Sequence, residues 1–468
     1  MLTMTESRAP APEQAPEQTP DAGSGGAPLR WAVVGGGMLG LTLALRLNQA
    51  GHQVTVFEAA DDFGGLASAW RVGDVTWDRY YHVITQSDTR LRALLAELDL
   101  EKEIRWGVTR TNFYTGQAMY PLNNVFDYLR LPVLGPLDKA RLAATILYAS
   151  RIKNGRPLEN LSAAEWLTRL SGARTYRNLW QPLLRSKLGS NEGKASAAYI
   201  WSVIRRFYGA RQGGMQREMF GYVSGGYGRV LDLLVRRLQA EGAVLKAGAP
   251  VTAVRPVPAG LALEVGAAVE TFDRVVNTCA APVALRVCQG LGADERQRHA
   301  AIDYQGIVCA SLLLERPLGG AYLTYITDPS IPFTTVIEMS SLVDPALTGG
   351  KHLVYLPRYV PTDDPLLEAT DEAIEAQFVT ALLRMFPDLR TEEISAVRVT
   401  RTRYVLALST QGYSDRLPPM ATAQPGLFIV NSAQIVNASL SVNETVNLAN
   451  EAAAALLAQD VPAGVAAR

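Results

Sequence analysis

The sequence is poor in the residues that would indicate a metal enzyme or a disulfide framework. Its 468 residues include only three cysteines, Cys279, Cys288 and Cys309, and four histidines. An odd number of cysteines without a C-x-x-C pair disfavours structural disulfides and dithiol chemistry, so we expect a reducing compartment. We expect no metal site either, because the usual nitrogen and sulfur ligands are few.

Long apolar runs and an excess of one charge are also missing. No stretch approaches the ~20 apolar residues that a membrane-spanning helix needs. Basic and acidic residues balance at 45 each, which favours neither nucleic acid nor an anionic membrane as a partner. Residues 1–28 are rich in proline and polar residues and lack the features of a secretory signal, so we expect a disordered tail. These absences predict a cytoplasmic protein without a transmembrane segment, and they leave the oligomeric state open.

The most informative stretch is residues 31–65, WAVVGGGMLGLTLALRLNQAGHQVTVFEAADDFGG. It predicts a strand, a glycine turn, a helix and a second strand that ends in an acid. Gly35, Gly37 and Gly40 have the G-x-G-x-x-G spacing, in which they allow a sharp turn, a close approach of pyrophosphate, and tight helix–strand packing, respectively. The context predicts a dinucleotide site, and a glycine turn in an ordinary βαβ unit is the alternative.

Further features narrow the identity of the bound dinucleotide. The helix that begins near Met38 and Leu39 would direct free N–H groups and its positive dipole end at the phosphates. Glu58 ends the second strand, where its carboxylate can accept hydrogen bonds from ribose hydroxyls but would repel the 2′-phosphate of NADP. A second glycine cluster at residues 225–228 has the wrong spacing and follows no apolar strand. An NADPH-fed monooxygenase or disulfide reductase is therefore disfavoured.

A glycine doublet follows the acid: Gly64 and Gly65 stand before Leu66 and Ala67. This start resembles the FAD-binding superfamily of flavin amine oxidases, protoporphyrinogen oxidases, phytoene desaturases and UDP-galactopyranose mutases. In that superfamily the doublet lets the chain pass close to the pyrophosphate and the flavin. The resemblance implies FAD as the cofactor, and it specifies the cofactor better than the substrate.

A second segment, residues 223–285, extends the resemblance. It combines a glycine turn, an amphipathic helix and short strands, like the second FAD-binding piece of the superfamily. The resemblance implies that the backbone of Val251 contacts the adenine side. It also implies that Thr278 lies at the end of a strand that returns to the sheet near the dinucleotide.

A third segment, residues 426–457, resembles the strand, loop and capped helix that complete such a site. Asn431 and Ser432 stand where the superfamily has Gly-Asp, so they would contact the ribityl-phosphate region without a negative charge. Val442 and Asn443 begin the last helix, which the resemblance places beside the flavin pyrimidine ring.

The resemblance implies an α/β fold with a Rossmann-like FAD-binding domain of the glutathione-reductase type, assembled from discontinuous segments, together with a mixed-sheet substrate domain and a helical insertion. The expected division is a disordered tail at 1–28, FAD-binding parts at 29–115, 223–285 and 406–468, a helical insertion at 116–222, and a substrate-domain sheet at 286–405.

An aromatic segment provides the catalytic candidates. Tyr80, Tyr81 and His82 form a dense polar-aromatic cluster, and UDP-galactopyranose mutases carry a similar segment at this point. We select His82 and Tyr81 as residues that would orient the substrate or transfer a proton. A half-buried strand with a structural histidine is the alternative.

Several charged residues have two interpretations. A cluster of arginines near the end of the insertion could bind a substrate diphosphate, but a solvated helix face is favoured; it comprises Arg205, Arg206, Arg211 and Arg217. Trp180 begins a candidate pocket wall that ends at Lys187, for which we expect a surface position. Glu338 lies in an apolar strand, and we expect it to face outward rather than into a pocket.

These features favour an FAD-dependent oxidoreductase, similar to protoporphyrinogen oxidase or amine oxidase, that transfers hydride from an organic substrate to flavin N5. The sequence offers no catalytic triad, which agrees with amine oxidation because that reaction requires no obligatory acid or base. The alternative is a redox-neutral mutase of nucleotide sugars, similar to UDP-galactopyranose mutase. Small molecules, lipids or sugar nucleotides are the implied substrates.

Overall fold

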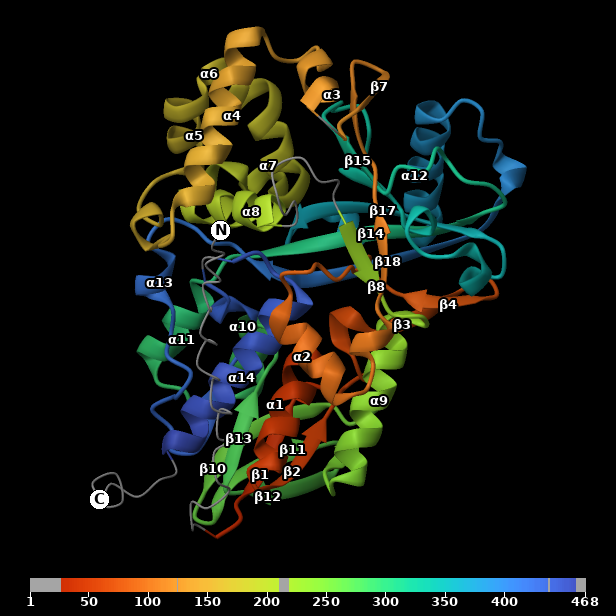
Figure 1. The fold of residues 1–468 in the computed structure, drawn as a ribbon. Coiled ribbons are helices and arrows are strands. Elements are labelled where there is room, and N and C mark those ends of the chain that lie inside the picture. Colours follow the sequence, from red (N-terminus) through yellow and green to blue (C-terminus); the bar gives the residue numbers. More distant parts are fainter. Residues whose placement is uncertain (1–26, 124, 210–218, 437, 460–468) are drawn as a thin grey trace, which may run out of the picture.

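The computed structural model describes residues 27–123, 125–209, 219–436 and 438–459. Figure 1 shows a lower part built on a parallel sheet and an upper part that combines a second sheet with a group of helices. The expected tail at 1–28 falls outside the described residues except for its last two, and Arg211 and Arg217 fall outside them as well.

The lower sheet has five parallel strands in the order β19-β13-β1-β2-β9. Their bounds are β1 Arg30–Val34, β2 Gln53–Phe57, β9 Val244–Lys246, β13 Arg274–Asn277 and β19 Leu427–Ile429. Both faces are covered, which explains why β1 and β2 are apolar over most of their length. Three segments that lie far apart in the sequence thus meet in one sheet.

Helices cover one face of this sheet, and a smaller sheet covers the other (Figure 1). The helices are α1 Met38–Gln49, α2 Thr89–Glu97, α9 Gly226–Ala240 and α14 Val442–Gln459. The opposite face packs against the antiparallel strands β10 Val251–Val257, β11 Gly260–Val265 and β12 Ala268–Phe272, and against α10 Ala281–Val287, with α11 Ala293–Ala300 beside it. Leucines of α1 and α9 interlock in the larger of the two cores.

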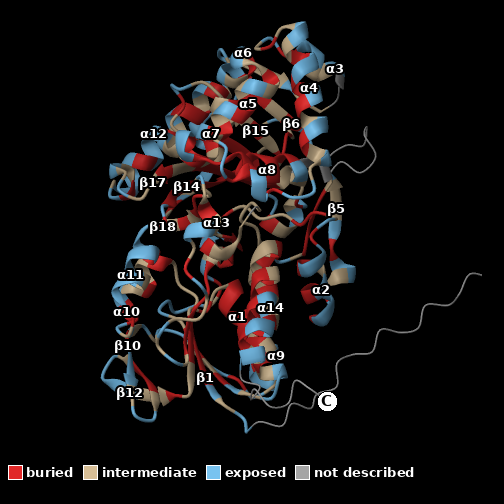
Figure 2. Ribbon diagram, turned by 90° about the vertical axis from the view of Figure 1, so that its left-hand side faces the viewer, coloured by how far each residue is buried: buried red, intermediate tan, exposed pale blue. Residues whose placement is uncertain are grey.

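The upper sheet has seven strands in the order β18-β14-β17-β16-β15-β6-β7, antiparallel throughout except between β15 and β6. Their bounds are β6 Thr111–Thr115, β7 Ala118–Pro121, β14 Tyr304–Leu314, β15 Leu323–Ile326, β16 Thr335–Glu338, β17 His352–Pro361 and β18 Ile394–Ala407. Helix α12 (Asp371–Met385) covers one face, and β14 is buried along its whole length, as the red strands of Figure 2 show. The expected domain boundary after residue 115 falls inside the β6–β7 hairpin.

The remaining helices form the group beside this sheet. They are α3 Val125–Arg130, α4 Pro136–Arg151, α5 Ala163–Ser171, α6 Ala173–Thr175, a π-helical turn at Tyr176–Trp180, α7 Gln181–Leu188 and α8 Ala197–Gly209, with α13 Tyr413–Arg416 near them. Ser162 is the N-cap of α5, because its hydroxyl accepts the Glu165 N–H at 3.4 Å. Two short antiparallel pairs complete the fold: the hairpin of β3 Ala69–Val72 with β4 Val75–Asp78, and the pairing of β5 Arg105–Val108 with the distant β8 Met219–Tyr222.

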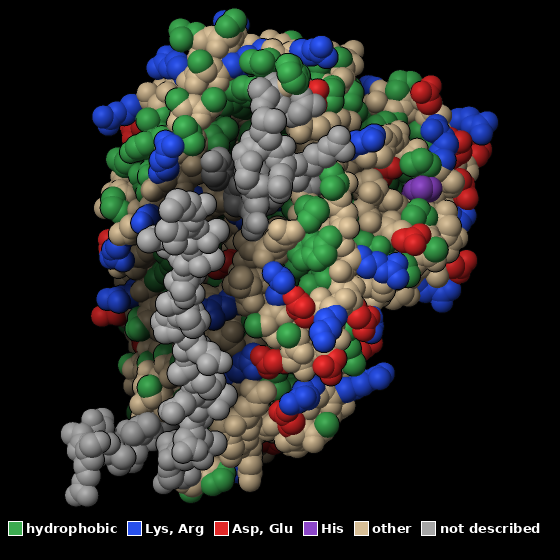
Figure 3. All heavy atoms as spheres, viewed as in Figure 1, with side chains coloured by type: hydrophobic (Ala, Val, Ile, Leu, Met, Phe, Trp, Pro, Cys, Tyr) green, Lys and Arg blue, Asp and Glu red, His purple; other side chains and the backbone are tan. Residues whose placement is uncertain are grey.

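The surface carries charges of both signs. On the face seen in Figure 1, lysine and arginine side chains lie next to aspartate and glutamate over the lower right (Figure 3). Exposed apolar side chains gather on α3 and α4, among them Phe126, Leu129 and Leu137. Within the described ranges, no helix has the length and apolar character needed to cross a bilayer.

Candidate functional site

A cavity of about 620 Å³ lies between the parallel sheet, the upper sheet and the helices α7 and α8. This volume is in the range of small-molecule and cofactor sites, about 300–1,000 Å³. One end of the cavity is formed by the glycine turns, and the other by aromatic and apolar side chains. The two ends therefore have different chemical characters.

The glycine-turn end collects most residues predicted for cofactor binding. Those lining it are Gly35, Gly37, Met38, Leu39, Glu58, Gly64, Gly65, Leu66, Ala67, Thr278, Ser432 and Val442. They come from the loop between β1 and α1, the end of β2, the loop after it, the end of β13, and the segment around the start of α14. The carboxyl ends of parallel strands thus meet at one edge, where ligands of α/β sheets bind.

The glycines of the first turn have the spatial roles that their spacing predicts. A Cβ on Gly40 would lie 1.9 Å from the Gly35 carbonyl oxygen, so only glycine allows this helix to pack so closely. A Cβ on Gly37 would meet nothing nearer than the Gly64 carbonyl oxygen at 3.8 Å, an ordinary van der Waals distance, so the position is not closed by a clash. Gly37 is the N-cap of α1 and has no side chain to satisfy the first N–H groups of the helix. This arrangement fits a pyrophosphate, which accepts hydrogen bonds from such N–H groups.

Glu58 is fixed at the end of β2 by backbone donors. Its carboxylate accepts the Gly36 N–H at 2.7 Å and the Ala60 N–H at 2.9 Å. Thr278 is fixed in the same way on the neighbouring strand, since its hydroxyl donates to the Val34 carbonyl at 3.0 Å. Both side chains line the cavity in defined positions.

Four predicted cofactor residues lie outside the cavity lining. Gly40 packs between α1 and β1, and Val251 begins β10, two residues after a backbone hydrogen bond from Ala249 to Glu58. Asn431 is buried and its side chain accepts the Ala433 N–H at 3.0 Å. Asn443 accepts the N–H groups of Arg90 and Leu91 and so caps α2.

The opposite end of the cavity is aromatic. Its lining includes Trp180, Leu183, Leu184, Tyr199, Ile200, Tyr322, Leu323, Tyr325, Tyr359, Tyr404 and Leu406. Helices α7 and α8 supply one wall, and strands β15, β17 and β18 supply another. The pocket wall expected to start at Trp180 does lie here, whereas the tyrosines of the sheet carry no motif that could have predicted their position.

Lys187 stands at this aromatic end. Its ammonium group donates to the Tyr81 hydroxyl at 2.9 Å and to the Tyr359 hydroxyl at 3.4 Å. It also lies 5.2 and 4.8 Å from the centroids of the same two rings, within the range of cation–π attraction. The expectation that Lys187 is a surface lysine is wrong, because the face of α7 that carries it packs toward β17.

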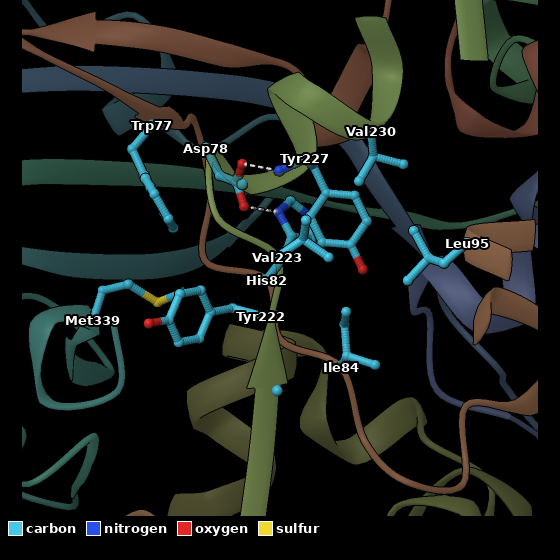
Figure 4. A pocket seen from close by; sticks show the side chains of 12 residues that line it. Trp77, Asp78, His82, Ile84, Leu95, Tyr222, Val223, Tyr227, Val230 and Met339 are labelled. Atoms are coloured by element: carbon cyan, nitrogen blue, oxygen red, sulfur yellow. Dashed lines mark hydrogen bonds and ion pairs between the residues drawn. The ribbon is translucent and has the colours of Figure 1, made fainter. Parts of the chain in front are cut away.

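His82 connects the cavity to a small buried pocket beneath it, shown in Figure 4. Asp78 is 2 % exposed, and its carboxylate points toward both the His82 ring and the backbone of Tyr227. The Tyr227 N–H donates to Asp78 Oδ1 at 2.7 Å, while His82 Nδ1 lies 3.8 Å from Oδ2. Asp78 stands four residues before His82, and no separate sequence pattern indicates it as a functional residue.

Burial shifts both members of this pair toward their neutral forms. Loss of solvation raises the pKa of Asp78 to about 8, against the opposing effect of the backbone donors of Tyr227 and Gly228. The same cause lowers the pKa of His82 to about 4, opposed by a backbone hydrogen bond to Tyr80. At neutral pH the pair therefore holds one proton, on Asp78, and the imidazole of His82 is neutral.

The other charged candidates occupy three different environments. Glu338 is 2 % exposed and accepts backbone N–H groups of Leu318 and Gly320, both at 2.9 Å, so its expected outward orientation is wrong. Arg205 is exposed and lies over the Trp201 ring. Arg206 lines the cavity, donates to Ser439 at 3.3 Å and approaches Asp88 at 3.9 Å.

Comparison with known proteins agrees with a flavoprotein site. The sequence profile of flavin containing amine oxidoreductases matches residues 39–457. The chain belongs to this family, and its cofactor is FAD.

Individual relatives are more distant. Coproporphyrinogen III oxidase of Mycobacterium tuberculosis is 28% identical over 234 residues, which cover 45% of this chain and 51% of that protein. The chain thus spans about half the length of the coproporphyrinogen III oxidases that it matches.

Solved structures show the same fold at low identity. An oxidoreductase from Methanosarcina mazei aligns with a TM-score of 0.71 and 18% identity over 91% of this chain and 99% of that one. Reduced UDP-galactopyranose mutase aligns with a TM-score of 0.70 and 16% identity over 93% and 95%.

Proposed function

We propose that this protein is an FAD-dependent oxidoreductase, similar to protoporphyrinogen oxidase and amine oxidase, that takes hydride from an organic substrate. The observation that carries the proposal is the single cavity that joins the glycine-turn end to the aromatic end. One continuous space allows a cofactor and a substrate to meet without a second dinucleotide site. When bound, FAD supplies the hydride acceptor, its N5 atom.

The proposed roles of the chain's own residues follow from their positions. Gly37, Met38 and Leu39 would hold the pyrophosphate with backbone N–H groups, and Glu58 would accept ribose hydroxyls. Gly64, Gly65, Leu66 and Ala67 form the adjacent wall, and Ser432 and Val442 stand at the end near α14. We propose cofactor contacts also for Gly35 and Thr278, and for the more remote Val251, Asn431 and Asn443.

The aromatic end would receive the substrate and exclude water from it. His82 lies on the cavity wall and is neutral near pH 7, so it could accept a proton released from the substrate. Tyr81 has a pKa raised well above its ordinary value, because burial disfavours the phenolate, and it would act as a hydrogen-bonding group that orients the substrate.

We also propose a finer description of the fold. The five-stranded parallel sheet with its helical and antiparallel layers agrees with a Rossmann-like FAD-binding domain of the glutathione-reductase type, assembled from three segments. The seven-stranded sheet would be the substrate domain, with α3–α8 as the helical insertion.

The test is reduction of the bound flavin. Purified protein should carry FAD with absorption bands near about 375 and 450 nm. Under anaerobic conditions, without added reductant, a substrate of the proposed class should bleach the band at longer wavelength. Protein that takes up no added FAD would refute the proposal.

A redox-neutral nucleotide-sugar mutase is the second candidate. It is favoured by two cations on the cavity wall, Lys187 and Arg206, which could meet a diphosphate. Such an enzyme would be active only after reduction of the flavin with dithionite, and no substrate would bleach the oxidised form.

A further inference from the structure

Lys187 brings a positive charge to the end of the cavity that the oxidoreductase reaction assigns to the substrate. Its ammonium has hydroxyl and ring contacts with Tyr81 and Tyr359, and no carboxylate lies within ion-pair distance among the residues that the structure describes. Lys187 is half-buried between α7 and β17. A cation in such a position is costly unless a partner compensates its charge.

The other charged side chains of the cavity do not compensate the positive charge of Lys187. Among the described lining residues Glu58 is the one acid, and it lies at the glycine-turn end with both carboxylate oxygens accepting backbone N–H groups. Arg206, the second cation, has Asp88 at 3.9 Å as a partner. The aromatic end therefore has a positive charge that the described residues leave unbalanced.

We propose that Lys187 binds an anionic group of the substrate, and that the substrate is an apolar or aromatic carboxylate rather than an amine. The proposal deepens the proposed function and rests on it, because FAD must occupy the other end of the same cavity. A carboxylate would accept a charge-assisted hydrogen bond from the ammonium. An alkylammonium group would meet a like charge and no acid at this end.

The wall around Lys187 favours a carboxylate over a phosphate. The lining around Lys187 consists mainly of tyrosines, a tryptophan and aliphatic side chains, and the one arginine of the described lining, Arg206, is already engaged by Ser439 and Asp88. A phosphate dianion prefers several donors and bidentate arginine, whereas one ammonium with neutral hydroxyls matches a single negative charge. Rings and aliphatic chains would contact the apolar part of the substrate.

The experiment compares matched ligands on the FAD-loaded protein by isothermal titration calorimetry. Phenylbutyrate, phenylbutanol and phenylbutylamine share a body and differ in the terminal group, and uridine diphosphate represents the diphosphate class. We expect phenylbutyrate to bind about tenfold more tightly than phenylbutanol, the scale of one charge-assisted hydrogen bond, and phenylbutylamine to bind most weakly.

Variants assign this preference to one side chain. Lys187→Gln should remove the advantage of phenylbutyrate and leave phenylbutanol unchanged, which also shows that the cavity is intact. Lys187→Arg should keep the advantage. Lys194→Gln is the matched control, since Lys194 lies in the same region but is exposed and pairs with Asp303 at 3.3 Å.

The outcomes separate the two proposals. Equal binding of the three matched ligands by the native protein, or an advantage that survives Lys187→Gln, would overturn the carboxylate proposal. Tighter, Lys187-dependent binding of uridine diphosphate would overturn it in favour of a diphosphate. Failure of the proposed function would appear separately, as a protein without flavin absorption or as a bound flavin that no substrate of the proposed class bleaches.

Discussion

The buried pair of Asp78 and His82 predicts how the free energy of unfolding depends on pH. Substituting one residue of the pair at a time should give pH profiles with slopes of opposite sign. A raised carboxyl pKa gives stability that is complete below the ordinary value of 3.8 and is lost as pH rises through about 8. A lowered imidazole pKa gives stability that is present above 6.5 and is lost as pH falls through about 4.

The two contributions cancel over part of the range. Between pH of about 4 and 6.5 the folded pair holds one proton on Asp78 and the unfolded pair holds one on the histidine, so the pair adds no slope. From about 6.5 to 8 only the folded pair holds a proton. The free energy of unfolding should then fall by about 2 kcal/mol, the equivalent of 1.5 pKa units.

Single substitutions remove the cancellation. Asp78→Asn leaves only His82, so the free energy of unfolding should rise by about 3 kcal/mol from pH 4 to 6.5 and then stay level. His82→Asn leaves only Asp78, so the free energy of unfolding should fall by about 5 kcal/mol from pH 4 to 8. Asn at residue 78 can still accept the Tyr227 N–H, which limits other damage.

The measurement is urea unfolding of the FAD-loaded native protein and both variants, at a fixed free FAD concentration and at several pH values across this range. Only differences between profiles are used, so that contributions of other titrating groups cancel. The reasoning is refuted if Asp78→Asn and the native protein give parallel profiles below pH of about 6.5, because Asp78 then titrates at its ordinary pKa.

Four other substitutions test the cavity and the contacts that support it. Gly37→Ala should leave the unfolding temperature unchanged but lower FAD affinity by about tenfold or more, measured by fluorescence titration, because its Cβ enters the space next to the N–H groups of α1. Gly40→Ala should instead destabilise the chain by about 2 kcal/mol or more, because its Cβ would clash with Gly35. Tyr81→Phe should weaken phenylbutyrate binding by about threefold in calorimetry. Phenylbutyrate should still bind more tightly than phenylbutanol, because Lys187 retains its contact with Tyr359. Complete loss of this difference between the two ligands would contradict the role of Lys187. Glu338→Gln should lower the free energy of unfolding by about 1–3 kcal/mol, measured with urea, because an amide NH₂ would face backbone donors. An unchanged free energy of unfolding would show that the hydrogen bonds from Leu318 and Gly320 to Glu338 do not hold the 318–320 loop.

The sequence could predict the glycine-turn end because its constraints are local. The spacing of Gly35, Gly37 and Gly40 is set by one turn, in which Gly40 packs against the Gly35 carbonyl, although Gly35 also lies against the distant Thr278. The aromatic end had no such local signal. Lys187 meets Tyr359, which is 172 residues away, so no pattern around either residue indicates the contact. The burial of Glu338 has no local signal for the same reason, since the backbone of residues 318–320, about 20 residues away, supplies its hydrogen bonds.

Asn431 and Ser432, which stand where the superfamily named above has Gly-Asp, affect the charge of the whole cavity. Asn431 turns its amide into the protein to cap the Ser432–Gln434 turn, and Ser432 lines the cavity with a neutral group. An acid at this place would have added a second negative charge to that of Glu58. Without it, the described lining carries Lys187 and Arg206 against a single carboxylate. The missing acid and the lysine thus act in the same direction, because both make the cavity more favourable for an anionic ligand and less favourable for an amine.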